Sequence, residues 1–302
     1  MNNKTLKRQY LQDVEITNTP RITCIKLFLK AFAPLGIIIL ASLVSNFISS
    51  LIKWVRLYNI YGTDLVNYNE SDSASEIIVS LVIKTFLSLL FIYIFTKKNF
   101  NTLKKDIKFK ESLKNQNKFQ YIKLGIALLF FIIFSCSYFG FIHSFTEYVN
   151  NTKYLASDIV KLILSATMIP IVEELSCRYV MYKTYTKINI RPTIAIILQA
   201  IFFSLMHMSI VSILPMLIFG IGLGFIINKS NSIWLTVIIH GIYNLSAGLL
   251  LMLFNMLPRI ACAISMIAAI VLCIFVFLIY MKEGTLHEKK VKKFIQDIKN
   301  AI

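Results

Sequence analysis

The chain has 302 residues, of which 57% are hydrophobic and 16% are charged, and its mean hydropathy is +0.68. This composition excludes an ordinary soluble globular domain, in which about a quarter of the residues are charged. The net charge of +17 does not indicate nucleic-acid binding. The basic residues stand in alternate loops between apolar runs and do not form a polar face with interleaved aromatic residues. The composition therefore predicts a membrane protein with no nucleic-acid partner.

Apolar stretches follow one another along the whole chain, and each is predicted to be a membrane-spanning helix. A helix needs about 20 mostly apolar residues to cross the hydrocarbon core of a bilayer. The predicted spans are 31–52, 77–96, 122–143, 160–187, 192–209, 211–228, 232–255 and 260–281. The sequence thus predicts an all-α polytopic membrane protein with about eight transmembrane helices in one bundle.

Lysine and arginine are distributed unevenly between the two sets of loops. Twenty-six of them lie in the N-terminal segment, in 96–123 and 176–191, at Lys229 or after Met281, whereas the opposite loops hold four. Cytoplasmic loops carry the excess of basic residues, so we expect a multi-pass protein of the cell membrane with both termini in the cytoplasm. The lysine-rich tail has apolar residues at helical spacing, which predicts a juxtamembrane helix on anionic lipid headgroups.

The predicted span 160–187 contains charges that the hydrocarbon core disfavours. Glu173, Glu174 and Arg178 lie within it, and each such charge costs about 2.5–3.5 kcal/mol on insertion scales. Charged residues are retained in spans where they face a bundle interior or a wet cavity. Glu174 and Arg178 are four residues apart, so a helix brings them together as an ion pair. Glu173 is then the unpaired carboxylate, which suits a general base.

Two of the four histidines also lie within predicted spans. His207 follows Phe203 by four residues, and His240 precedes Asn244 by four. The second spacing places an imidazole and an amide on one face of a helix. A single histidine in a membrane helix is often a packing or interhelical hydrogen-bonding residue. Together with the acidic residues, however, these groups predict one shared polar cavity.

The chain carries three motifs in a fixed order: EExxxR from Glu173 to Arg178, FxxxH from Phe203 to His207, and HxxxN from His240 to Asn244. This order resembles the CAAX protease and bacteriocin-processing family, also called the Abi family, over about residues 155–250. Pro170 before the acidic pair and Ser232-Ile233-Trp234 before the last motif add to the resemblance. Tyr179 and Asn231 stand where glycine is common in that family, and neither belongs to the proposed reacting groups.

The resemblance implies an intramembrane endopeptidase that depends on a glutamate. Glu173 and His207 would activate a water molecule, and His240 and Asn244 would donate hydrogen bonds to the oxyanion. Glu174, Arg178 and Phe203 would be structural or supporting residues. A set formed by Glu173, His207 and His240 could ligate zinc, but there is no HExxH helix, and metal-free activation of water is equally compatible.

We therefore divide the chain into three parts. Residues 1–150 comprise an N-terminal cytoplasmic segment and the first three transmembrane helices. Residues 151–255 form a catalytic core that resembles CAAX proteases. Residues 256–302 comprise the last transmembrane helix and a basic cytoplasmic tail.

Other polar and small residues predict packing and receive no catalytic role. Gly220 and Gly224 form a GxxxG pattern, which predicts close helix packing. The 37 uncharged residues of 192–228 are slightly few for two full spans and a turn. Either those helices are short, or the link between them enters the membrane. Lys84 and Asn46 are expected to snorkel or to hydrogen bond across helices.

Several functions are compatible with these residues. The expected partners are the lipid bilayer and a membrane-associated peptide or protein substrate: a CaaX-type tail, a leader peptide or a bacteriocin-related peptide. Alternatively, the chain is a non-proteolytic membrane scaffold or bacteriocin-immunity factor that retains the protease fold. A third class is a proton-coupled transporter, which also uses acids and histidines inside the membrane.

Overall fold

The structure is a computed structural model that describes residues 21–61, 74–96, 118–146, 156–187, 190–207 and 209–282. Every regular element within these ranges is a helix, so the predicted all-α fold class is confirmed. The predicted juxtamembrane helix after Met281 falls almost entirely outside the described residues, as do residues 62–73 and most of the basic loop at 96–123.

The elements coincide closely with the apolar stretches of the sequence. They are α2 (Arg21–Tyr61), α3 (Ala74–Thr96), α6 (Lys118–Thr146), α7 (Ala156–Glu174), the π-helix η4 (Leu175–Tyr182), α8 (Lys183–Lys187), α9 (Pro192–Leu205), α10 (Ile210–Ser230), α11 (Ile233–Asn255) and α12 (Arg259–Lys282). α7, η4 and α8 follow one another without a break. Within the described ranges, five helices are long and apolar enough to cross a membrane, in α2, α6, α10, α11 and α12. The multi-pass architecture agrees with the prediction, and the count of eight spans stays a prediction.

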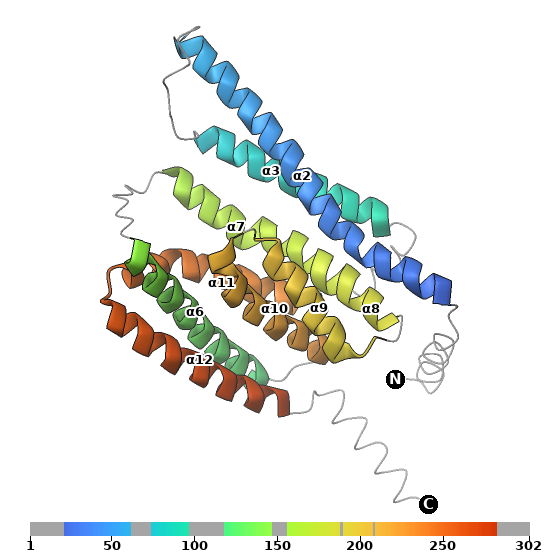
Figure 1. Cartoon of the computed structure of the whole chain (residues 1–302), viewed down its shortest axis with the longest axis vertical. Helices are drawn as coiled ribbons and strands as arrows, with labels where there is room; N and C mark the ends of the chain where they lie inside the picture. The colour runs from blue at the N-terminus through green and yellow to red at the C-terminus, as the bar shows by residue number, and fades with distance from the viewer. Residues whose placement is uncertain are drawn as a thin grey trace, which may run out of the picture.

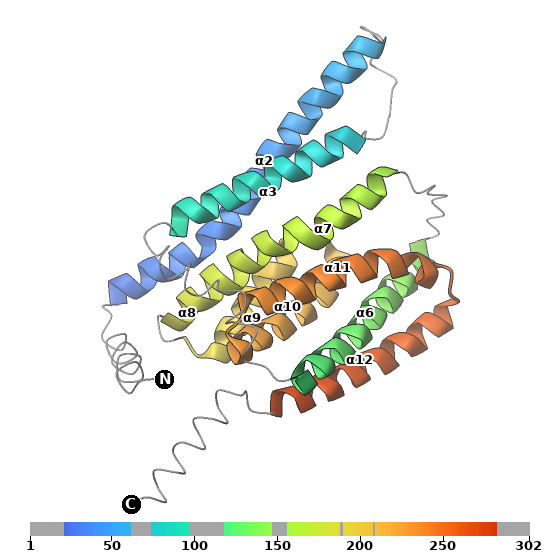
Figure 2. The ribbon, with the colours of Figure 1, turned by 180° about the vertical axis from the view of Figure 1, so that it is seen from behind.

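The helices are arranged as two outer pairs around a central group. α2 and α3 lie together on one side of the molecule, and α6 and α12 lie together on the opposite side (Figures 1 and 2). Between them, α7 contacts α3 on one face and α11 on the other, and α9 packs against α10. The three sequence motifs are therefore all carried by the central helices.

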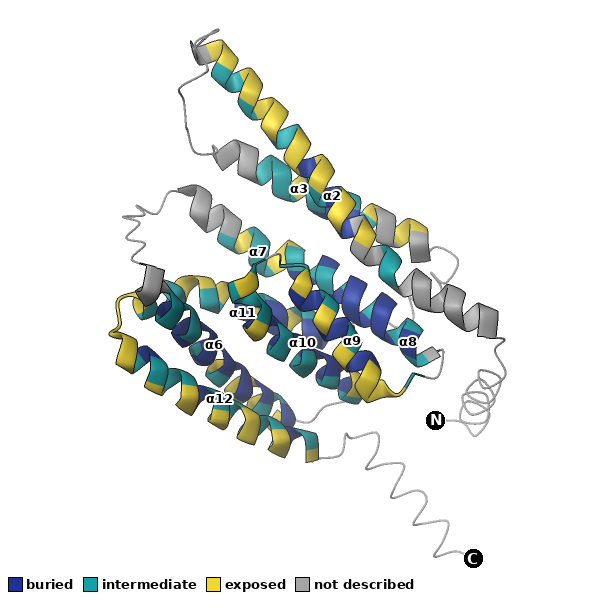
Figure 3. Ribbon diagram, viewed as in Figure 1, coloured by how far each residue is buried: buried dark blue, intermediate teal, exposed yellow. Residues whose placement is uncertain are grey.

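The distribution of polar residues is the reverse of that in a soluble protein. Large apolar side chains such as Phe47 on α2 and Phe275 on α12 are exposed, and Figure 3 shows exposed residues along the outer faces of both helices. In contrast, Glu174, Arg178 and His240 are almost completely buried. Charged residues are rarely buried unless they are paired. This pattern fits a bundle that meets lipid on its outside and holds polar groups inside.

α7 and α11 approach each other closely at Gly241. Pro170 lies inside α7 and has no N–H to bond the carbonyl group of Ala166, four residues earlier. A Cβ atom at Gly241 would lie only 2.5 Å from that carbonyl oxygen, so the contact requires glycine. Since His240 directly precedes Gly241 on α11, this contact brings its imidazole to the acidic residues that follow Pro170.

α9 and α10 pack through the glycines of the GxxxG pattern. A Cβ atom at Gly220 would lie 3.1 Å from the Cα atom of Ala200, and one at Gly224 would lie 2.7 Å from the side-chain nitrogen of Gln199. The predicted role of this pattern in close helix packing is therefore confirmed. α9 has 14 residues, which agrees with the prediction that a helix in this part of the chain is short.

Candidate active site

The predicted ion pair between Glu174 and Arg178 is present at the centre of the bundle. Nη1 of Arg178 donates to Oε1 of Glu174 at 2.9 Å, and both side chains are fully buried. Nη2 donates to the carbonyl oxygen of Gly220 at 3.3 Å. The guanidinium carbon lies 4.4 Å from the centre of the Phe203 ring. A buried charge is tolerated when such partners replace its hydration, so the pair fixes η4 against α9 and α10.

Gln199 belongs to the same network, although the sequence motifs do not include it. This fully buried side chain donates to the carbonyl oxygens of Gly220 at 2.9 Å and Ile196 at 3.0 Å. The carbonyl of Gly220 thus accepts from both Gln199 and Arg178. An amide inside a long uncharged run was the available signal, because polar groups in a span are expensive unless they have partners.

The helix that carries the acidic pair changes its hydrogen-bonding pattern directly after Glu174. Residues Leu175–Tyr182 form a π-helix, η4, and six of its eight residues are buried. π-helical turns are rare and frequently occur at functional sites. The segment continues as a helix to Lys187, as predicted, but no pattern of residues predicts this change in hydrogen bonding.

His240 lies between the two carboxylates. Its Nδ1 is 2.9 Å from Oε1 of Glu174, and its Nε2 is 3.7 Å from Oε2 of Glu173. The edge-on rings of Phe203 and Phe219 contact the imidazole, with ring centres at 5.6 and 5.3 Å. Glu174 is ionised against Arg178, so Nδ1 is the donor in its bond to this carboxylate. The sequence analysis paired Glu174 only with Arg178, whereas the structure shows that it also orients His240.

Glu173 is the less buried of the two acids. Its side chain is 16% exposed, against 0% for Glu174. Oε2 of Glu173 is buried and forms no hydrogen bond with the described residues. A carboxylate oxygen without a donor keeps its lone pairs available, so Glu173 can accept a proton from a water molecule.

His207 and Asn244 join the site through backbone contacts. Nδ1 of His207 lies 2.9 Å from the carbonyl oxygen of Phe203, which requires the proton on Nδ1 and leaves Nε2 as an acceptor in the neutral ring. The Phe203 ring contacts the rings of both His207 and His240. Nδ2 of Asn244 donates to the carbonyl oxygen of Ser165 at 2.8 Å, which joins α11 to α7.

The structure thus brings five of the predicted site residues into direct contact and attaches the other two less directly. Glu173, Glu174, Arg178, Phe203 and His240 form one chain of direct contacts. His207 is attached to this chain through Phe203, and Asn244 lies one helical turn beyond His240. The catalytic roles of these residues stay predictions.

A three-ligand metal site was one of the alternatives open from the sequence. Among the residues that the structure describes, no group of three His, Cys, Asp or Glu side chains is arranged to hold a metal ion. The donor set Glu173, His207 and His240, as placed, does not fit a zinc site. We therefore derive no step through a metal.

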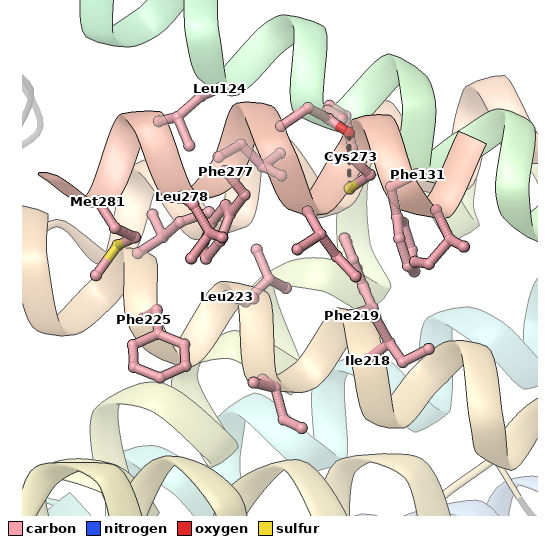
Figure 4. Close-up of a pocket in the computed structure, with 18 residues that line it drawn as sticks. Leu124, Phe131, Ile218, Phe219, Leu223, Phe225, Cys273, Phe277, Leu278 and Met281 are labelled. Carbon is pink, nitrogen blue, oxygen red and sulfur yellow. Dashed lines mark hydrogen bonds between the residues drawn. The ribbon is translucent and has the colours of Figure 1, made fainter. Parts of the chain in front are cut away.

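The structure also contains an apolar cavity of about 380 Å³. It lies among α6, α10, α11 and α12, and its lining is almost entirely apolar (Figure 4). Phe219 is one of the lining residues, and its ring also contacts His240. The Phe219 ring therefore lies between this cavity and His240.

Comparison with protein families agrees with the motifs. Residues 155–246 match the family model described as Rce1-like, type II CAAX prenyl endopeptidase. The comparisons with curated proteins and with solved structures find no match. The matched range includes all three motifs and lies within the predicted core, 151–255. The resemblance drawn from the motifs is thus confirmed at the level of the family: within a multi-pass helical membrane protein, residues 155–246 match the CAAX protease family.

Proposed function

We propose that the chain is an intramembrane endopeptidase in which Glu173 is the general base. The observation that supports this most directly is the contact chain from Arg178 through Glu174 and His240 to Glu173. Arg178 neutralises one carboxylate, which then orients the imidazole. The second carboxylate keeps a free oxygen beside that imidazole, in a site from which bulk water is largely excluded.

The reaction follows from these positions. Glu173 takes a proton from a water molecule, and the resulting hydroxide attacks the carbonyl carbon of the scissile amide. When both ring nitrogens carry protons, His240 donates to Glu174 through Nδ1 and to the oxyanion through Nε2. The tetrahedral intermediate then releases the amine, which takes the proton from Glu173. No group outside the chain and the water is needed to balance this sequence.

His207 acts on the attacking water, and Asn244 acts on the oxyanion. The free Nε2 of His207 accepts a hydrogen bond from the attacking water and orients it. Asn244 uses one N–H for the carbonyl of Ser165 and has a second N–H, which donates to the oxyanion. These two assignments follow the order of the motifs in the family.

We propose a membrane-associated peptide or protein with an apolar group as the substrate. The cavity behind Phe219 has almost no polar lining and is suited to a lipid-like chain. A prenylated CaaX-type tail is accordingly the first substrate to test, followed by leader peptides and bacteriocin-related peptides. The excess of basic residues on one side of the predicted spans supports an orientation with both termini in the cytoplasm.

The decisive experiment compares the peptides in cell membranes that contain the native protein with those in membranes containing Glu173→Gln. A precursor peptide that accumulates only with Glu173→Gln would identify the substrate, and purified protein in vesicles should then cleave it. Asn46→Ala is the matched control, because Asn46 is an exposed polar residue on α2. Cleavage that persists in Glu173→Gln would overturn the proposal. A cellular phenotype without any peptide product would instead indicate a scaffold.

A further inference from the structure

α3 brings polar side chains against Glu173 from outside the family-matched residues. A small cavity of about 10 Å³ lies between α2, α3 and α7. It is lined by Ile38, Lys84, Thr85, Ser88, Ile169, Val172 and Glu173. α3 contacts α7 in this region, and Figure 2 shows the two helices side by side. The general base of the proposed reaction thus shares a cavity with three polar residues of one helix.

Two oxygen atoms of these lining residues have unmet hydrogen-bonding capacity. Oε2 of Glu173 and Oγ of Ser88 are both buried, and neither has a hydrogen-bond partner among the described residues. Ser88 itself is 0% exposed. Leaving a buried polar group unsatisfied costs about 1–3 kcal/mol, and in folded proteins an ordered water often satisfies such groups.

The size and lining of the cavity fit one water molecule. A buried water needs roughly 10–15 Å³ of accessible volume and two to four polar partners. Glu173 offers an acceptor, and Ser88 offers a hydroxyl group that can donate or accept. Thr85 uses its hydroxyl proton for the carbonyl of Leu81 at 2.8 Å, and its oxygen remains an acceptor. The cavity therefore meets both conditions.

Lys84 is the basic residue in the lining of this cavity. It is the only charged residue between 77 and 96, and a lysine in a span costs about 2.5–3.5 kcal/mol unless it has a polar environment. On α3 it lines the same cavity as Glu173 of α7. A water between an ammonium group and a carboxylate is oriented by both, since it accepts from the first and donates to the second.

We propose that a water bound in this cavity connects Glu173 with Ser88 and Lys84, and that Lys84 and Ser88 are positioning residues for the general base. This inference rests on the proposed catalytic role of Glu173. The two α3 residues hold the carboxylate in the orientation from which it takes the proton of the attacking water. The complete site accordingly includes a helix that lies outside residues 155–246.

The test measures kcat and KM of the full-length protein in vesicles with a peptide substrate found by the membrane comparison described above. Lys84→Met should lower kcat about tenfold or more, because misplacing a reacting group reduces the rate steeply, while KM changes less than about twofold. Lys84→Arg keeps the charge and should restore kcat to within about threefold of native. Ser88→Ala should lower kcat in the same direction. Lys123→Met, on α6, is the matched control and should leave both constants unchanged.

The outcomes separate this inference from the proposed function. If Glu173→Gln is inactive while Lys84→Met and Ser88→Ala keep the native kcat, the positioning role is wrong and the endopeptidase proposal stands. If Glu173→Gln is fully active, the proposed function is wrong as well. Should Lys84→Met fail to fold, Ser88→Ala and Lys84→Arg test the positioning role instead. Ser88→Ala nearly keeps the size of the native side chain, and Lys84→Arg keeps its charge. A rise in KM with unchanged kcat would also overturn the inference.

Discussion

Oε1 of Glu174 is the meeting point of two donors, since Nη1 of Arg178 and Nδ1 of His240 both lie 2.9 Å from it. One oxygen thus joins an ion pair within a helix to an imidazole on another helix. Arg178 and His240 are both almost completely buried, so neither can exchange this partner for bulk water. Glu174 is therefore the residue that couples the stability of the bundle to the orientation of its active-site histidine.

We expect Glu174→Gln to impair stability and activity together. The substitution leaves the charge of Arg178 buried without its counter-ion, and breaking a buried pair in this way typically costs about 3–5 kcal/mol. It also replaces the oriented acceptor of His240. Thermal unfolding in detergent and peptide cleavage measure the two effects. Thr167→Ala, an exposed position on the same helix, should change neither, and an active, fully stable Glu174→Gln would contradict the coupling.

A double substitution tests whether the charge of Arg178 is the cause of that loss. Glu174→Gln combined with Arg178→Met removes both charges, and apolar replacement of a buried pair is often neutral or stabilising. We expect the double variant to unfold at a higher temperature than Glu174→Gln alone, while cleavage stays low because His240 still lacks its acceptor. Losses in stability that simply add would show that the two side chains are not coupled.

The helices and the ion pair could be predicted from the sequence because both depend on local spacing. Long uncharged runs define the spans, and Glu174 and Arg178 meet because they are four residues apart. The bond between Glu174 and His240 joins residues 66 positions apart and depends on how α7 packs against α11. The π-helix is set by backbone hydrogen bonds and leaves no pattern of apolar residues. Lys84 looked isolated because its position against α7 is a tertiary contact.

Gly241→Ala tests whether the close approach of α11 to α7 positions His240. The added Cβ would lie 2.5 Å from the carbonyl oxygen of Ala166, so the helices must separate. Overpacking of this kind costs about 1–3 kcal/mol, and the displacement should lower kcat more than it raises KM. Gly125→Ala on α6 is the control, since nothing lies within 4 Å of a Cβ atom there. A native rate for Gly241→Ala would show that the contact is not needed.

Asn244→Ala distinguishes an oxyanion donor from a purely structural amide. The hydrogen bond to the carbonyl of Ser165 is worth about 0.5–1.5 kcal/mol of stability, which is a modest loss. Removal of an oxyanion donor instead lowers kcat by about 10²–10³-fold. We therefore expect a small change in unfolding temperature and a large fall in kcat, with KM nearly constant. A fall in unfolding temperature without a matching fall in kcat would leave Asn244 as a link between α7 and α11.

Gly222→Phe tests whether the apolar cavity receives a lipid group of the substrate. Gly222 lines this cavity on α10, and nothing lies within 4 Å of a Cβ atom at that position. A phenylalanine there can project into the cavity without disturbing the backbone, and it should exclude a long apolar chain. We expect KM for a prenylated peptide to rise about tenfold or more, since each buried methylene contributes about 0.8 kcal/mol. The same peptide without its prenyl group should show unchanged kinetics, because Phe219 still separates the filled cavity from His240. Equal effects on both peptides would instead indicate a general disturbance of the bundle, and no effect on either would place the lipid group elsewhere.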